Sequence, residues 1–196
     1  MSSSIQHDEV APSVAAAMPG VGHAMGRLDA EIDHIFEVVR GNAMVDRGFY
    51  SASAVGDWSL IWHLMGVAQG LADHRDGWFR AVRLSAALGA ESALVNGLIK
   101  SCFRRARPAH GEDRPHNLRI PVTSSFPSGH ASSAFMAAHL LADRTRFGGA
   151  WYLLAAVVAS SRIHVRIHHA SDVIGGAVVG LALGAVVRRL APLDRT

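Results

Sequence analysis

Residues 173–187 read VIGGAVVGLALGAVV, a run without a charged side chain that ends at the pair Arg188-Arg189. A helix that crosses the hydrocarbon core of a membrane needs about 20 mainly apolar residues, and this run approaches that length. Its small residues suit close packing between helices inside a bilayer. The run therefore predicts one helix of a membrane-embedded bundle.

Apolar stretches on the N-terminal side of this run predict the other helices. Apolar blocks lie at residues 57–72, 81–99 and 148–161, a further helix is predicted over 128–141, and apolar positions at helical spacing predict an amphipathic helix over 28–40. Together these segments predict an all-α fold, a membrane helical bundle of about five to six helices. Because the blocks are short and the second carries Arg83 and Glu91, a soluble all-α bundle is the alternative.

Length and composition fit one membrane-associated domain. The chain has 196 residues, of which 49% are hydrophobic and only 18% are charged, against about 25% charged residues in soluble domains. Residues 1–26 are rich in Ser, Ala and Pro and are predicted to form a flexible tail, with the helical domain over 27–196. The tail lacks a basic start followed by an apolar run, so no cleavable signal peptide is predicted.

Basic residues between the predicted helices indicate an orientation. If the helices alternate across a membrane, one side receives the connections near 73–80 and 143–147 and the C-terminal end. These carry His74, Arg75, Arg80, Arg144, Arg146, Arg188, Arg189 and Arg195. The positive-inside tendency makes this side cytoplasmic. The connections at 100–127 and 162–171 then share the opposite side, and their own basic residues require a functional explanation.

The first chemical motif is Lys100, six residues, then Arg107-Pro108. A helix that continued through this segment would place the two cations on one face, because they are seven residues apart. Lys as a point charge and Arg as a bidentate fork suit a phosphate dianion. The alternative is an ordinary basic edge of a membrane helix that holds lipid headgroups.

The second motif is Pro127-Ser128-Gly129-His130 at the start of the predicted helix over 128–141. Ser is a good N-cap, and Gly lets the backbone approach a ligand closely. The N–H groups at a helix start form an anion site, where His130 can donate a proton to a leaving alcohol. The alternative is a plain capped turn.

The third motif is Ser161-Arg162, five residues, His168, three residues, Asp172. On a helix, residues four apart can meet, and a carboxylate on one imidazole nitrogen leaves the other free to attack. Arg162 adds a third phosphate ligand. The alternative is a capped, salt-bridged helix start.

Taken in this order, the three motifs resemble the signature of the type 2 phosphatidic acid phosphatase superfamily, with every position of the signature filled between residues 100 and 172. The hydrophobic segments around them resemble the helical core that this superfamily shares with acid phosphatases and vanadium haloperoxidases. Residues 1–26 lie outside the resemblance.

The resemblance implies a role for each signature residue. His168 would be the nucleophile that forms a phosphohistidine, Asp172 would orient it, and His130 would protonate the leaving group and then activate water. The groups that would hold the phosphate oxygens are Lys100, Arg107, Ser128, Gly129 and Arg162. Three cations would then stabilise the developing charge, so neither a metal nor another cofactor is expected.

The expected function is therefore that of an integral-membrane lipid phosphatase that hydrolyses a phosphomonoester or diphosphate of a phospholipid or polyprenyl lipid. Its partners would be a phosphorylated membrane lipid and the membrane itself, with no nucleic acid. It would be a multi-pass protein of the cell membrane whose active site faces the extracytoplasmic side. The alternatives are a soluble acid phosphatase of the same superfamily and a non-catalytic phospholipid-binding membrane protein.

Several residues beside the motifs are assigned other roles. His164 and His169 flank the third motif but fall off its pattern and are expected to be structural or to line the cavity. Arg104, Arg105 and Arg166 are expected to contact headgroups or solvent. The single cysteine, Cys102, is not expected to be catalytic.

Overall fold

The structure of the chain is a computed structural model that describes residues 19–73, 76–109, 118, 121–143 and 145–193. The predicted all-α fold is confirmed, since these residues form helices and no strand. The helices are α1 (Pro19–Glu37), α2 (Ala43–Val55), α3 (Leu60–Ala72), α4 (Gly77–Ser92), α5 (Gly129–Leu141), α6 (Gly148–His164) and α7 (Ala170–Leu190). A 3-10 turn, Asp57–Ser59, precedes α3, and a π-helical segment, Ala93–Ile99, and a second 3-10 turn, Lys100–Cys102, continue α4.

Seven α-helices in the described part of the chain exceed the predicted five to six, chiefly because α2 was not predicted. The buried positions of α2 are Asp46 and Ser53, so this helix has no apolar core-facing stripe for a periodicity argument to detect. Its start is nevertheless marked, because the Asn42 side chain accepts hydrogen bonds from the N–H groups of Met44 and Val45.

The predicted tail over residues 1–26 also needs correction, because α1 begins at Pro19. Proline is favoured in the first turn of a helix, where its missing N–H costs nothing. Gly20, Gly22 and Gly26 lower the helix propensity of this segment, and so its composition resembled a tail. Residues 1–18 lie outside the described part of the chain.

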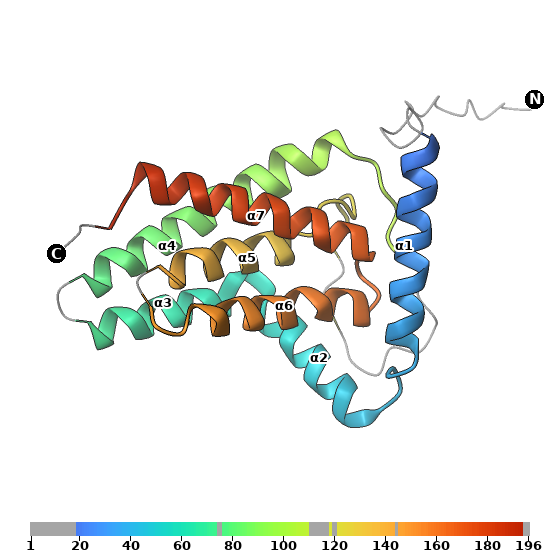
Figure 1. The fold of residues 1–196 in the computed structure, drawn as a ribbon, viewed down its shortest axis with the longest axis horizontal. Coiled ribbons are helices and arrows are strands. Elements are labelled where there is room, and N and C mark those ends of the chain that lie inside the picture. The colour runs from blue at the N-terminus through green and yellow to red at the C-terminus, as the bar shows by residue number, and fades with distance from the viewer. Residues whose placement is uncertain (1–18, 74–75, 110–117, 119–120, 144, 194–196) are drawn as a thin grey trace, which may run out of the picture.

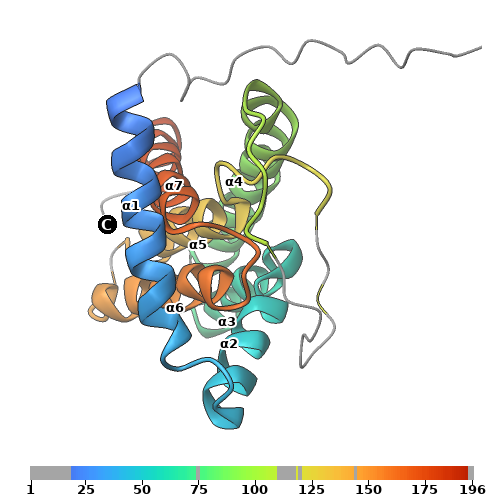
Figure 2. The ribbon, with the colours of Figure 1, turned by 90° about the vertical axis from the view of Figure 1, so that its right-hand side faces the viewer.

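Helices α3 to α7 lie alongside one another, and α1 crosses one end of this bundle (Figure 1). Figure 2 looks onto that end, with α1 beside α6 and α7. Helix α5 is central: it packs against α7, α6 and α4, and most of its residues are buried. The first turns of α5 and α7 and the last turn of α6 all reach the end that α1 covers (Figure 1).

A row of glycines sets the close approach of α7 to α5. Gly176, Gly180 and Gly184 recur every four residues and share one face of α7. A methyl group at Gly176 would collide with the backbone oxygen of Ser128, and one at Gly180 with that of Ser132. Only glycine therefore allows this backbone-to-backbone packing, which holds the starts of the two helices together.

The outer faces of the bundle are apolar. Helix α7 is the one helix in the described residues that is long and apolar enough to cross a membrane by length and composition. Exposed large apolar side chains on the bundle helices include Leu60, Leu64, Val67 and Leu71 of α3; Trp78, Phe79 and Val82 of α4; Leu153 and Val157 of α6; and Ile174, Val178, Val186 and Leu190 of α7. An exposed apolar surface of this extent indicates contact with a lipid or protein surface.

The glycine row generates a prediction about stability. Replacing Gly180 by alanine should destabilise the protein by about 1–3 kcal/mol, because the added methyl group forces α5 and α7 apart. The matched change Gly89→Ala, in the exposed middle of α4 with open space around it, should stabilise the protein by up to about 1 kcal/mol. Thermal unfolding of both variants in detergent measures the difference. Equal stability of the two variants would contradict the packing argument.

Candidate active site

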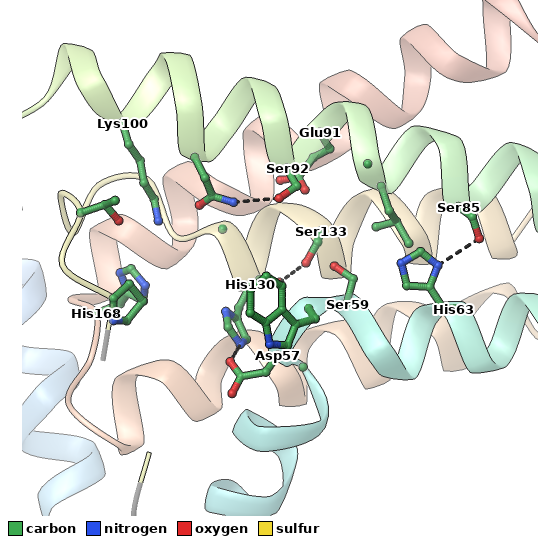
Figure 3. A pocket seen from close by; sticks show the side chains of 18 residues that line it. Asp57, Ser59, His63, Ser85, Glu91, Ser92, Lys100, His130, Ser133 and His168 are labelled. Carbon is green, nitrogen blue, oxygen red and sulfur yellow. Dashed lines mark hydrogen bonds and ion pairs between the residues drawn. The ribbon is translucent and has the colours of Figure 1, made fainter. Parts of the chain in front are cut away.

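A cavity of about 380 Å³ opens where the first turn of α5, the end of the α4 segment and the α6–α7 connection meet. It is lined by one or more residues of each chemical motif: Lys100 of the first, Gly129 and His130 of the second, and His168 of the third (Figure 3). Three segments that are far apart in the sequence therefore contribute to one site, as the sequence predicted.

His168 lies in the connection between α6 and α7 and is 2% exposed. The N–H groups of Ile167 and His168 both donate to the carbonyl oxygen of Arg162 at 3.1 Å, which fixes this connection. The expected meeting of His168 with Asp172 occurs, but the histidine precedes α7 rather than sharing a helix face with the carboxylate.

The surroundings of the His168 ring define its tautomer. Nδ1 lies 3.6 Å from Oδ2 of Asp172 and 3.4 Å from Oγ of Ser125, whereas Nε2 lies 3.3 Å from Nη1 of Arg107. Because a guanidinium can only donate, Nε2 must carry the lone pair and Nδ1 the proton. Burial lowers the pKa of His168, although the Asp172 carboxylate opposes that shift, so the ring is neutral near pH 7. The lone pair on Nε2 is therefore directed toward a cation.

Asp172 is fully buried in the first turn of α7. Its Oδ2 accepts hydrogen bonds from Oγ of Ser125 at 2.5 Å and from the N–H of His169 at 2.8 Å, and its Oδ1 accepts one from Arg105 at 2.6 Å. His169 thereby caps α7, which is a structural role. These donors hold the carboxylate in its charged form and fix its orientation beside His168.

Arg105 was expected to contact headgroups or solvent, but in the structure it binds side chains inside the protein. Its Nη1 donates to Asp172 and to Oγ of Ser171, and its Nη2 donates to Oδ2 of Asp29 at 2.5 Å. Asp29, on α1, also accepts from the N–H of Ser171 at 2.8 Å and from its hydroxyl at 2.9 Å. Through Arg105, helix α1 is thus connected to the carboxylate that lies beside His168. No sequence pattern links Asp29 to a motif 76 residues away.

The three motif cations converge, although not by the predicted route. The α4 segment ends at Cys102 and Phe103 is extended, so Lys100 and Arg107 do not share a helix face. Arg107 instead reaches the site from a loop, where the carbonyls of Pro121, Thr123 and Ile167 accept its hydrogen bonds at 2.9–3.1 Å.

Lys100 and Arg162 complete this cationic group. Lys100 is 5% exposed, and Arg162, in the last turn of α6, is 1% exposed and donates to the hydroxyl of Ser53. Burial lowers the pKa of Lys100 to about 8, and the charges of Arg107 and Arg162 act in the same direction. Lys100 lines the cavity, and Arg107 and Arg162 lie close enough for their charges to act on it. A multiply charged anion beside these three cations would relieve their mutual repulsion.

The second motif forms the start of α5. The Ser128 side chain accepts from the N–H of Ala131 as an N-cap, and the backbone N–H of Ser128 donates to the carbonyl of Asp172 at 2.9 Å. This bond joins the second motif to the third. A methyl group at Gly129 would lie 2.9 Å from Oδ1 of Asn96, so a larger residue here would displace the Asn96 side chain.

His130 has its own carboxylate partner, which sequence reasoning missed. Nε2 of His130 lies 3.0 Å from Oδ1 of Asp57 in the 3-10 turn before α3 (Figure 3). The site thus contains two histidine–aspartate pairs that border one cavity. His164, by contrast, lies buried 2.8 Å from Asp46 and stacks on Phe49, which is the structural role that its position off the motif predicted.

These parts define the class of protein. A helical bundle that places two histidine–aspartate pairs at one cavity, with three cations grouped at or behind its wall, has the groups needed to transfer a phosphoryl group through a histidine nucleophile. A family model described as the PAP2 superfamily matches residues 80–195. The chain belongs to the PAP2 superfamily and is a phosphatase of that family.

Named relatives are similar over most or part of the chain. Decaprenylphosphoryl-5-phosphoribose phosphatase of Mycolicibacterium smegmatis is 36% identical over 150 residues, which cover 76% of this chain and 80% of the relative. The protein of the same name from Mycobacterium tuberculosis is 34% identical over 154 residues. A lipid A 1-phosphatase of Rhizobium etli is 35% identical over 96 residues, 45% of this chain and 41% of the relative.

Two crystal structures share the fold. A transmembrane PAP2-type phosphatidylglycerolphosphate phosphatase from Bacillus subtilis superposes with a TM-score of 0.62 at 22% identity, covering 85% of this chain and 86% of that protein. LpxE of Aquifex aeolicus superposes with a TM-score of 0.65 at 24% identity, covering 82% of this chain and 94% of that protein.

The Arg105 network predicts a positioning role for residues that do not line the cavity. Arg105→Gln should lower kcat by about 10- to 100-fold with little change in KM, because Asp172 loses a charged partner while the three cavity cations remain. Asp29→Asn should act in the same direction and more weakly. Arg104→Gln is the matched control, since Arg104 is exposed. Steady-state kinetics on the purified variants measure these effects, and a rise in KM alone would contradict them.

The depressed pKa of Lys100 predicts an alkaline limit of activity. Below pH 8 the ammonium is charged and attracts phosphate, and above pH 8 it is neutral, so kcat/KM should fall as the pH rises through about 8. Lys100→Arg keeps its charge at higher pH and should move this limb upward by at least one pH unit. The pH profile of kcat/KM tests this, and an unmoved limb in Lys100→Arg would assign the limit to another group.

Proposed function

We propose that this chain is an integral-membrane lipid phosphatase that hydrolyses a phosphomonoester through a phosphohistidine on His168. The observation that carries this proposal is the ring orientation of His168: Nδ1 faces Asp172, and Nε2 faces Arg107 at the cationic end of the cavity. A phosphate drawn to Lys100, Arg107 and Arg162 therefore meets the lone pair that would attack it.

In the first step, Nε2 of His168 forms a bond to phosphorus as the bond from phosphorus to the leaving oxygen breaks. Protonated His130 gives its proton to that oxygen, so the leaving group departs as an alcohol. The His168 ring keeps its Nδ1 proton and becomes positively charged, and the Asp172 carboxylate stabilises that charge. Lys100, Arg107 and Arg162 stabilise the charge that spreads over the three other phosphate oxygens.

In the second step, neutral His130 takes a proton from water while the water oxygen bonds to phosphorus. The bond from Nε2 to phosphorus breaks, its electron pair returns to His168, and inorganic phosphate leaves. Asp57, 3.0 Å from His130, stabilises the protonated ring at the end of this step and readies it for the next turnover. The three cations supply the charge stabilisation that a divalent ion gives in other phosphatases, so we propose a metal-independent reaction.

The apolar outer surface supports a membrane lipid as substrate. Exposed Leu, Val, Ile, Trp and Phe side chains on α3, α4, α6 and α7 suit lipid contact better than water, which favours membrane embedding over the soluble acid phosphatase alternative. The matched relatives are named for a decaprenylphosphoryl phosphoribose and for lipid A. A phosphorylated lipid of the polyprenyl or phospholipid type is the proposed substrate.

The arrangement of the helices supports an extracytoplasmic active site. The α3–α4 and α5–α6 connections and the C-terminal end lie at the end of the bundle away from α1, and the site lies toward α1 (Figure 1). Arg80, Arg146, Arg188 and Arg189 belong to the far end, which the positive-inside tendency makes cytoplasmic. The sequence indicated this orientation with four further basic residues that lie outside the described part of the chain: His74, Arg75, Arg144 and Arg195.

Trapping of the phosphoenzyme tests the proposed function. Wild type mixed with a radiolabelled long-chain aryl phosphate in EDTA should form an acid-labile, alkali-stable phosphoenzyme. His168→Ala should form none and lose at least about 1,000-fold in kcat. His130→Ala should accumulate the phosphoenzyme, because an aryl leaving group needs no proton whereas the attacking water needs a base.

The control for this experiment is His34→Ala, because His34 is an exposed histidine of α1. It should behave as wild type. A phosphoenzyme that persists in His168→Ala, or activity that EDTA abolishes and Mg²⁺ restores, would overturn the proposal.

A further inference from the structure

The cavity extends well beyond the groups that react with phosphate. Figure 3 shows Lys100 and His168 toward one end and His63 and Ser85 toward the other. This second end is polar: Nδ1 of His63 lies 3.0 Å from Oγ of Ser85, and Ser59, Ser92 and Glu91 line the wall nearby. A cavity that received only an apolar chain at this end would desolvate these polar groups without replacing their hydrogen bonds.

Glu91 is the least expected member of this wall. It lies on α4, is 3% exposed, and belongs to none of the three motifs. The Ser132 hydroxyl and the charge of Lys100 both act on its carboxyl group, yet within the described residues its Oε1 is buried and makes no hydrogen bond. A buried carboxyl oxygen without a partner is costly and rare in natural proteins. An ionisable side chain at such a position in an apolar helix indicates function.

The direction of the reaction places the leaving group at this polar end. In phosphoryl transfer the attacking atom and the leaving oxygen lie on opposite sides of phosphorus. His168 attacks from one end of the cavity, and His130, which protonates the leaving oxygen, lies between His168 and the end marked by His63 (Figure 3). The remainder of the leaving group then extends past His130 along the wall that contains Glu91.

We infer that Glu91 determines specificity by accepting a hydrogen bond from a hydroxyl of the leaving group. The substrate of this cavity is then a phosphate ester of a polyhydroxylated headgroup, such as a phosphorylated sugar, rather than of a plain hydrocarbon alcohol. Ser59, Ser85 and Ser92 can each donate and accept, which suits further hydroxyls. This inference rests on the proposed function, because it assigns the leaving-group side of the same site.

A pair of synthetic substrates separates recognition from chemistry. Decyl ribofuranoside 5-phosphate carries free hydroxyls beside the phosphate, and decyl phosphate carries none. Wild type in detergent should show at least about a tenfold higher kcat/KM for the glycoside. Glu91→Met, unbranched and similar in size, should lower kcat/KM for the glycoside by about 10- to 100-fold and leave hydrolysis of decyl phosphate within about twofold.

Glu91→Gln keeps an acceptor oxygen but no charge, so it should lose only a few-fold on the glycoside and nothing on decyl phosphate. If Glu91→Met fails to fold, the kinetics of Glu91→Gln on the two substrates test the inference instead. Glu31→Gln is the matched control, since Glu31 is an exposed carboxyl of α1, and it should match wild type on both substrates.

The outcomes are distinguishable. If Glu91→Met lowers kcat/KM equally for both substrates and shifts the alkaline limb of the pH profile, Glu91 only supports the charge of Lys100. That result would overturn the inference. Equal or better use of decyl phosphate by wild type would overturn it as well. Hydrolysis of neither substrate, with no phosphoenzyme formed, would instead be a failure of the proposed function.

Discussion

The active site depends on one buried negative charge, the carboxylate of Asp172. It receives the hydroxyl of Ser125, the N–H of His169 and the guanidinium of Arg105, and it lies beside Nδ1 of His168. Its backbone carbonyl also accepts from the N–H of Ser128. A fully buried carboxylate is stable only with such a set of donors. The same donors join α7, α5, α1 and the loop before α5, so the network that stabilises the charge also assembles the site.

Charge compensation explains why neighbouring arginines have different roles. Arg105 forms ion pairs with the carboxylates of Asp29 and Asp172, so its charge is neutralised inside the protein. Arg107, two residues further on, is oriented mainly by backbone carbonyls, which position the guanidinium without neutralising it. It therefore remains able to bind a phosphate dianion. An arginine near a motif cannot be assigned by its spacing alone, because its role is set by the partners that the fold supplies.

The sequence predicted the helices whose apolar residues recur at a regular spacing, and it predicted that the three motifs share one site. The apolar blocks become α3, α4, α6 and α7, and the three motifs meet at one cavity. Periodicity could not reveal α2, whose buried side chains are Asp46 and Ser53. It also suggested a continuous helix from Lys100 to Arg107, where the chain instead leaves the helix after Cys102. The partners Asp29, Asp57 and Ser125 were not predicted, because only tertiary packing places them beside Arg105, His130 and His168.

Several of these unpredicted partners come from the part of the chain before the family match at residues 80–195. Asp29 holds Arg105, Ser53 accepts from Arg162, and Asp57 pairs with His130. The motifs thus line the cavity, whereas α1, α2 and the turn before α3 provide partners that hold motif side chains in place. A chain with the three motifs but different N-terminal helices would lack these three partners, so the motifs alone do not specify the geometry of the site.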